Sequence, residues 1–159
     1  MYVYNIQIYN DKMYTMSNEY VIIAPVSGTS FKYLHMTICF LGHVDDKKLD
    51  IIKEDLQILS KQVLPLEITF GHADLFGPNY EIPVLLVDIV DKDKLKLLDE
   101  FYQKYHAPTE EGVEDTGHQN YHVNVKKVLG ELSLLDSRSL NTLNLKQIGD
   151  HPAIIYDGL

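Results

Sequence analysis

Two segments of the chain carry apolar residues at the spacing of an amphipathic helix. In residues 46–63 these residues stand at i, i+3, i+7 and i+10, namely Leu49, Ile52, Leu56 and Leu59. The same intervals return after Asp91, with Leu95, Leu98, Tyr102 and Tyr105. A helix with one apolar stripe is stable when that stripe packs against another layer. The sequence therefore predicts two helices that lie on a second layer in similar ways.

Strand-forming runs surround the two helices and supply that layer. They lie at 2–8, 13–16, 19–24, 34–41, 66–75, 82–90, 120–128, 142–148 and 153–156. Alternating apolar residues, or β-branched residues between turn residues, indicate a strand. The order predicts a single α+β domain over residues 1–159. Its two pseudo-symmetric lobes are each a small antiparallel sheet with a helix on the outer face, and they enclose a central cleft. We expect Asp45 and Asp91 to cap the helices.

The charge of the chain limits its partners. The formal net charge is −9, which disfavours binding to duplex DNA or long RNA but permits a small anionic ligand held by local donors. Cys39 is the single cysteine, so an intramolecular disulfide is excluded and a reducing compartment is suitable. The sequence has neither a signal-peptide pattern at its start nor an apolar run of membrane-spanning length. We therefore expect a cytoplasmic protein with no membrane partner.

Two strand-like phrases in different halves of the chain are similar to each other. The sequence reads His-Met-Thr from His35 and His-Val-Asn from His122. Side chains on a strand alternate between two faces, so His35 and Thr37 share one face, as do His122 and Asn124. The opposite faces are apolar, with Met36, Ile38 and Phe40 on the first strand and Tyr121, Val123 and Val125 on the second. Each strand is thus suited to pack on a helix and to line a polar cleft.

This pattern is suited to phosphodiester cleavage if the two strands are neighbours. Two imidazoles would then converge on one point, and an ordinary histidine pKa of about 6.5 makes both protonation states available near neutrality. One histidine accepts a proton from the attacking hydroxyl or water, and the other donates a proton to the departing oxygen. Thr37 and Asn124 would donate to the non-bridging oxygens. This chemistry needs no cofactor and no metal, and the residues do not decide which histidine is the acid.

At these residues the chain resembles the 2H phosphoesterase superfamily, which includes the 2′-5′ RNA ligase-like enzymes and cyclic nucleotide phosphodiesterases. The hallmark of that superfamily is two His-x-Thr/Ser motifs in the lobes of a duplicated α/β fold. His35 and Thr37 match the first motif, and Phe40-Leu41-Gly42 also follows the family pattern. His122 matches the second motif, whereas Asn124 stands where the family has Thr or Ser. The resemblance implies a phosphodiesterase with a small nucleotide as its substrate.

The resemblance extends to viral members that degrade cyclic dinucleotides and so silence host immunity, such as phage anti-CBASS phosphodiesterases. A composition rich in Lys, Ile, Asn and Tyr is consistent with an AT-rich viral genome. We therefore expect hydrolysis of a cyclic dinucleotide or oligonucleotide second messenger, in the host cytoplasm if the protein is viral. The alternative substrates are a 2′,3′-cyclic phosphate and 2′-5′ RNA. A nucleotide-sequestering protein without turnover is the alternative from another class.

Further residues are candidates for substrate contacts. Lys126 continues the face of His122 if no bulge intervenes, and would attract a phosphate. Tyr4, Tyr33 and Tyr156 lie on or near segments that border the expected cleft, where a base would stack on a ring. Each also has an ordinary explanation, as a solvated lysine or a core tyrosine.

Two further chemistries, a cysteine nucleophile and a zinc site, are less consistent with the sequence. The alternation places Cys39 on the face of His35, but no base accompanies it and a lone cysteine is usually a small buried hydrophobe. His118 and His122 have the i, i+4 spacing of a zinc pair on a helix, but Gly117 and the β-forming residues that follow argue against a helix there. A metallohydrolase is therefore the third hypothesis, and we predict no metal site.

Overall fold

The computed structural model describes residues 18–26, 35–77, 79–108, 118–124, 137–148 and 153–156, with only the backbone for 137 and 153–156. Along the chain the elements are β1 (Asn18–Pro25), β2 (His35–Val44), α1 (Asp46–Val63), β3 (Leu66–Phe76), β4 (Ile82–Ile89), α2 (Lys92–Tyr105), β5 (His122–Asn124), β6 (Ser137–Leu140), β7 (Asn144–Ile148) and β8 (Ala153–Tyr156). The strands predicted at 2–8 and 13–16 lie outside the described residues.

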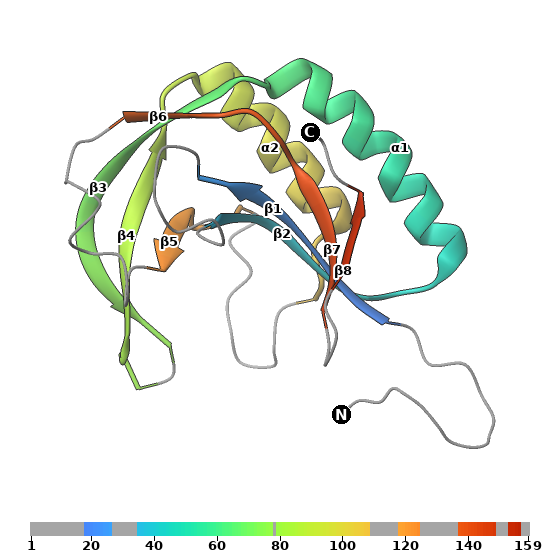
Figure 1. The fold of residues 1–159 in the computed structure, drawn as a ribbon, viewed down its shortest axis with the longest axis horizontal. Helices are drawn as coiled ribbons and strands as arrows, with labels where there is room; N and C mark the ends of the chain where they lie inside the picture. The colour runs from blue at the N-terminus through green and yellow to red at the C-terminus, as the bar shows by residue number, and fades with distance from the viewer. Residues whose placement is uncertain are drawn as a thin grey trace.

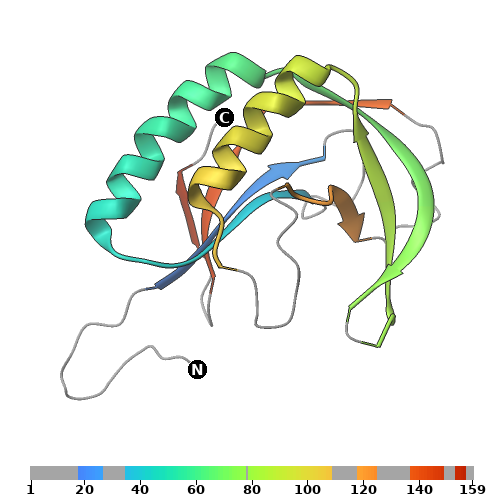
Figure 2. The same ribbon diagram turned by 180° about the vertical axis from the view of Figure 1, so that it is seen from behind.

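The strands form one curled antiparallel sheet with the order β6-β3-β4-β5-β2-β1-β7-β8. Figures 1 and 2 show that both helices lie on the same face of this sheet. Neither helix covers the opposite face, which we call the open face. The predicted α+β fold is confirmed. Its two small sheets are the four-stranded halves on either side of the β5–β2 pair, and pairing of Met36 with Val123 joins them.

Both helices begin where the capping chemistry predicts. The Asp45 side chain accepts a hydrogen bond from the Lys48 amide at 2.8 Å, and the Asp91 side chain accepts from the amides of Asp93 and Lys94. The stripe of α1 is buried in the core as Leu49, Ile52, Leu56, Leu59 and Val63. The buried residues of α2 are Leu98, Phe101 and Tyr105. Among the described residues, no helix is both long and apolar enough to cross a membrane.

Strand β2 departs from strict alternation, and two predicted side-chain directions are wrong for that reason. Cys39 pairs with Ile22, whereas Thr37 pairs with the next residue of β1, Ile23. Ile38 is therefore the extra residue of a β-bulge, which shifts the alternation by one position. Cys39 joins Ile38 in the buried core instead of sharing the face of His35. Phe40, predicted to be apolar core, is 41% exposed.

Candidate active site

A fully buried row of side chains fixes the two faces of the sheet. Across four adjacent strands, β4, β5, β2 and β1, the paired residues are Leu85, Val123, Met36 and Ala24. All four side chains are fully buried, and they belong to the same core cluster as the buried residues of the helices. Because side chains alternate along each strand, the residues immediately before and after this row project to the opposite, open face.

The predicted site residues occupy these flanking positions. In an antiparallel pair with Met36 opposite Val123, Thr37 stands opposite His122 and His35 stands opposite Asn124. Directly opposed Cβ atoms are about 4.5–5.5 Å apart, and diagonal neighbours such as His35 and His122 are about 7–8 Å apart. His35, Thr37 and His122 are half-buried and Asn124 is exposed. The fold thus brings all four residues together on one face.

Two neighbours hold the His122 ring. The ring Nδ1 lies 2.7 Å from the backbone oxygen of Asn120. A carbonyl oxygen only accepts hydrogen bonds, so Nδ1 carries the proton, and Nε2 is the nitrogen that exchanges protons with a substrate. The Phe76 ring meets the His122 ring edge to face, with 4.6 Å between centroids. The imidazole is therefore oriented from the backbone on one side and from the end of β3 on the other.

Three residues on or beside the cross-strand row of His122, namely Asn144, Phe76 and Asn120, were not predicted from the sequence. Thr37 pairs with Ile23, and Ile23 pairs in turn with Asn144 of β7. Asn144 is a buried polar residue in the same cross-strand row as His122. Phe76 and Asn120 were also missed, because they precede a turn and a short strand and belong to no motif. Only the pairing of distant strands reveals these neighbours.

The fold resembles known phosphoesterase structures. The crystal structure of Escherichia coli LigT complexed with phosphate matches with a TM-score of 0.55 at 10% sequence identity, covering 90% of this chain and 97% of that chain. The same protein complexed with ATP matches with a TM-score of 0.51 at 12% identity, covering 90% and 97%. A further crystal structure of a phosphoesterase matches with a TM-score of 0.53 at 10% identity, covering 88% and 96%. At these identities the likeness shows the fold.

The sequence itself also matches a family. Residues 32–84, one third of the chain, match the family model described as LigT like Phosphoesterase. That range contains His35 and Thr37 on β2. Over this range the chain is similar to the LigT-like phosphoesterases. A comparison with curated protein sequences gives no match.

Most of the predicted substrate-binding residues lie outside the described part of the chain. Tyr4, Tyr33 and Lys126 lie outside the described residues. Tyr156 belongs to β8, and its backbone pairs with Leu145. Its side chain is not described. These four assignments stay predictions.

The described residues bear on the cysteine nucleophile and on the helical zinc pair. Burial raises the pKa of the Cys39 thiol to about 12, so the thiol stays protonated near neutrality and is a poor nucleophile. Residues 118–121 form no helix and lead directly into β5, so His118 and His122 do not have the geometry of a helical pair. In the part of the chain that is described, no three His, Cys, Asp or Glu residues form a group suited to a metal ion.

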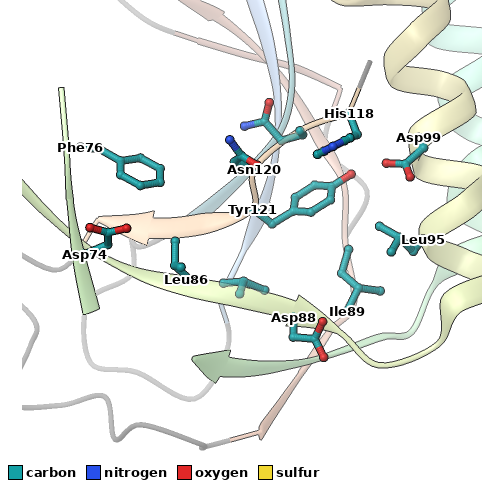
Figure 3. A pocket seen from close by; sticks show the side chains of 12 residues that line it. Asp74, Phe76, Leu86, Asp88, Ile89, Leu95, Asp99, His118, Asn120 and Tyr121 are labelled. Carbon is teal, nitrogen blue, oxygen red and sulfur yellow. The ribbon is translucent and has the colours of Figure 1, made fainter. Parts of the chain in front are cut away.

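A cavity of about 560 Å³ lies beside residues 118–121, which lead into β5. Figure 3 shows Phe76 at one end of it and His118, Tyr121 and Asp99 gathered at the other. The cavity shares Phe76 and Asn120 with the surroundings of His122. It is therefore placed to hold part of a molecule whose reacting group lies at the histidines.

Proposed function

We propose that this protein is a 2H phosphoesterase that hydrolyses a cyclic dinucleotide or oligonucleotide second messenger, with His35 and His122 as its acid–base pair and without a metal. The observation that carries the proposal is the β2–β5 register, in which Met36 is paired with Val123. That register sets the two histidines diagonally across one open face. Diagonal neighbours of this kind are about 7–8 Å apart, which leaves room for a phosphate group between the rings.

The reaction requires two proton transfers. A water oxygen forms a bond to phosphorus while one neutral imidazole takes the proton of the water. The bond from phosphorus to the ribose oxygen breaks while the other imidazole, protonated, gives its proton to that oxygen. The products are a phosphomonoester and a free hydroxyl group. For His122 either role uses Nε2, because the Asn120 oxygen holds the Nδ1 proton.

Charge that grows on the non-bridging oxygens needs donors on the same face. Thr37 stands opposite His122 and Asn124 stands opposite His35, so a hydroxyl and an amide flank the phosphate position. Donors fixed in this way stabilise the transition state because they need no reorganisation during the reaction. Asn124 departs from the Thr or Ser of the family, but its amide group also donates.

The size and charge of the ligand follow from several observations. Structures similar to this chain are of LigT complexed with phosphate and of LigT complexed with ATP, which supports a small nucleotide as the ligand. The net charge of −9 disfavours long polyanions. A cavity large enough for a base adjoins His122. A cyclic second messenger meets these conditions, and its destruction would serve a virus in evading host immunity.

A second candidate is cleavage of a 2′,3′-cyclic phosphate or of 2′-5′ RNA, since the same two histidines would serve either bond. A third is sequestration of the nucleotide without turnover. Asn124 is the observation that favours it, because the second motif lacks the hydroxyl of the family pattern.

The test is chromatography of a substrate panel after incubation with the protein in the presence of EDTA. The panel holds cyclic dinucleotides, cyclic oligonucleotides, 2′,3′-cyclic mononucleotides and a 2′-5′ dinucleotide. We expect His35→Ala and His122→Ala each to lower kcat by roughly 10²- to 10⁴-fold, the usual contribution of one general acid or base. His43→Ala is the matched control, because His43 lies on the same strand, is 60% exposed and faces Glu19.

The outcomes separate the candidates. Turnover that survives EDTA and depends on both histidines supports the proposal, and the cleaved compound identifies the bond. Loss of turnover in EDTA with recovery on adding a divalent metal would refute the metal-free mechanism. Full activity in either histidine variant would refute the acid–base pair. Tight binding of a panel compound that is released unchanged would favour sequestration.

A further inference from the structure

The cavity beside His122 contains polar groups that have no hydrogen-bond partner among the described residues. The Tyr121 side chain is only 6% exposed, and its hydroxyl has no hydrogen-bond partner among the described residues. Within the same described set, Oδ1 of Asp99 on α2 is also buried without a partner. Buried polar groups in native proteins are nearly always hydrogen-bonded, so each unsatisfied group requires an explanation. A ligand that completes both hydrogen bonds is one such explanation.

These groups lie together and face the cavity. In Figure 3 the Tyr121 hydroxyl, the Asp99 carboxylate and the His118 ring point toward one another at one end, and Leu86 and Ile89 lie along the wall. The segment that carries Tyr121 is held beside β4 by a hydrogen bond of 2.9 Å, which the Val87 amide donates to the backbone oxygen of Tyr121. The donor and acceptor groups therefore have fixed positions, while the walls between them are apolar.

The environment determines the states of these groups. Burial, with a smaller contribution from the charge of Asp99, raises the pKa of Tyr121, so its hydroxyl remains a donor. Burial also raises the pKa of Asp99, and the charge of His118 acts in the opposite direction. Asp74 and Asp88 line the cavity as well. Asp88 is paired with Lys92 at 3.0 Å, but the described residues that line the cavity include no lysine or arginine. The cavity is therefore better suited to the base of a nucleotide than to its phosphate.

We propose that this cavity is a nucleobase subsite that favours guanine, an inference that rests on the function proposed above. The Watson–Crick edge of guanine presents N1–H and an exocyclic amine side by side, and one carboxylate accepts from both. The Tyr121 hydroxyl donates to the adjacent O6. Adenine and cytosine present a ring acceptor beside their amine, which would face the Asp99 carboxylate. Uracil flanks its single N–H with two carbonyl oxygens.

The position of the cavity connects base recognition to catalysis. Phe76 lines the cavity and also contacts the His122 ring. Asn120 lines it and orients the same ring through its backbone oxygen. The cavity runs from Asp99 and Tyr121, on the side of α2, to Phe76 and Asn120 beside His122, so a nucleotide whose base binds at the first end would extend its ribose and phosphate toward the histidines. Asp99 and Tyr121 would set specificity without touching the reacting atoms.

The test measures binding and needs no turnover. Isothermal titration of the full chain compares the 3′-monophosphates of guanosine, inosine and adenosine, which contain no phosphodiester. Inosine is the matched ligand, since its base is guanine without the exocyclic amine. We expect guanosine monophosphate to bind about tenfold more tightly than inosine monophosphate, a usual value for one hydrogen bond to a charged group, and adenosine monophosphate to bind more weakly still.

Two variants locate the preference. Asp99→Asn keeps one acceptor oxygen. We therefore expect the affinity for guanosine monophosphate to fall about tenfold, to the affinity that the unchanged protein has for inosine monophosphate. Tyr121→Phe keeps the shape of the side chain and removes only the hydroxyl. This variant should weaken the binding of guanosine and inosine monophosphates equally, since both bases carry O6. It also provides a readout if Asp99→Asn does not fold.

Equal binding of guanosine and inosine monophosphates would overturn the inference, as would an unchanged guanine preference in Asp99→Asn. The proposed function fails by a different result. Guanine-selective binding without cleavage of any phosphodiester would refute the enzymatic proposal and support the subsite. Cleavage with no base preference would refute the subsite and leave the enzymatic proposal intact.

Discussion

Asn124 is the residue at which this chain departs from the family pattern, and its position makes the departure testable. It stands opposite His35 on the open face, and it is exposed. An amide there can donate to a non-bridging oxygen in the transition state. We expect Asn124→Ala to lower kcat by about 10²- to 10³-fold with little change in KM, because the hydrogen bond strengthens as charge develops.

The matched variants separate the hydrogen bond from other effects of substitution. Asn124→Thr restores the family residue and should keep or raise kcat. Asn141→Ala removes an exposed asparagine from the loop before β7 and should leave kcat unchanged. Steady-state kinetics on the compound selected from the panel give both constants. Full kcat in Asn124→Ala would show that the second motif contributes only its histidine.

At the scale of elements, the helices are separable from the site. Helix α1 packs on the face of the sheet opposite to the histidines, and its first turn depends on the 2.8 Å hydrogen bond from the Lys48 amide to Asp45. Asp45→Ala removes that acceptor and should lower the free energy of unfolding by about 1 kcal/mol, the typical value of an N-cap. Asp45→Asn should keep most of this contribution to the free energy of unfolding, because asparagine caps equally well.

Urea denaturation of the two variants checks this expectation, with kcat measured below the unfolding transition. Asp45→Ala should retain full kcat, since no part of the cap reaches the open face. Equal stability losses in the two variants would show that the cap hydrogen bond is not the source of the effect. A selective loss of kcat in Asp45→Ala would show that α1 is coupled to the site.

Features that depend on interactions between residues close in the chain could be predicted from the sequence. Helix starts were predicted because the capping acceptor and its amides are within three residues of each other. The shared face of His35 and Thr37 was predicted because strict alternation holds up to Ile38. It fails beyond that residue, since the bulge arises only in the pairing with β1. Strand β6, with the sequence Ser-Arg-Ser-Leu, has no apolar alternation and is defined by pairing with β3.

The candidate site divides in the same way. Two motifs, each within three residues, marked His35 and His122, and the register then placed them on one face. The Phe76 contact with His122 depends on the curl of the β3–β4 hairpin, and the cavity depends on how α2 lies beside β4 and residues 118–121. No local pattern encodes either arrangement. The catalytic roles themselves stay predictions until the variants are measured.

At the scale of the whole molecule, charge separates a small-nucleotide enzyme from an RNA-binding one. The formal net charge of −9 means that every phosphate beyond the one in the site adds repulsion from the molecule as a whole. An enzyme that follows long RNA instead needs a basic track, and its affinity falls steeply as salt rises. The dependence of binding on oligonucleotide length and on salt therefore distinguishes the two.

We expect short oligonucleotides to inhibit hydrolysis less well as they lengthen. With a common 3′ end, a chain of about ten nucleotides should have a higher Ki than a mononucleotide at about 20 mM salt. The difference should narrow at about 200 mM, where the screening length falls below 10 Å. Competition assays at the two salt concentrations measure it. A Ki that falls with length at low salt and rises with added salt would instead indicate a basic path for RNA, and the substrate would then be the end of a longer chain.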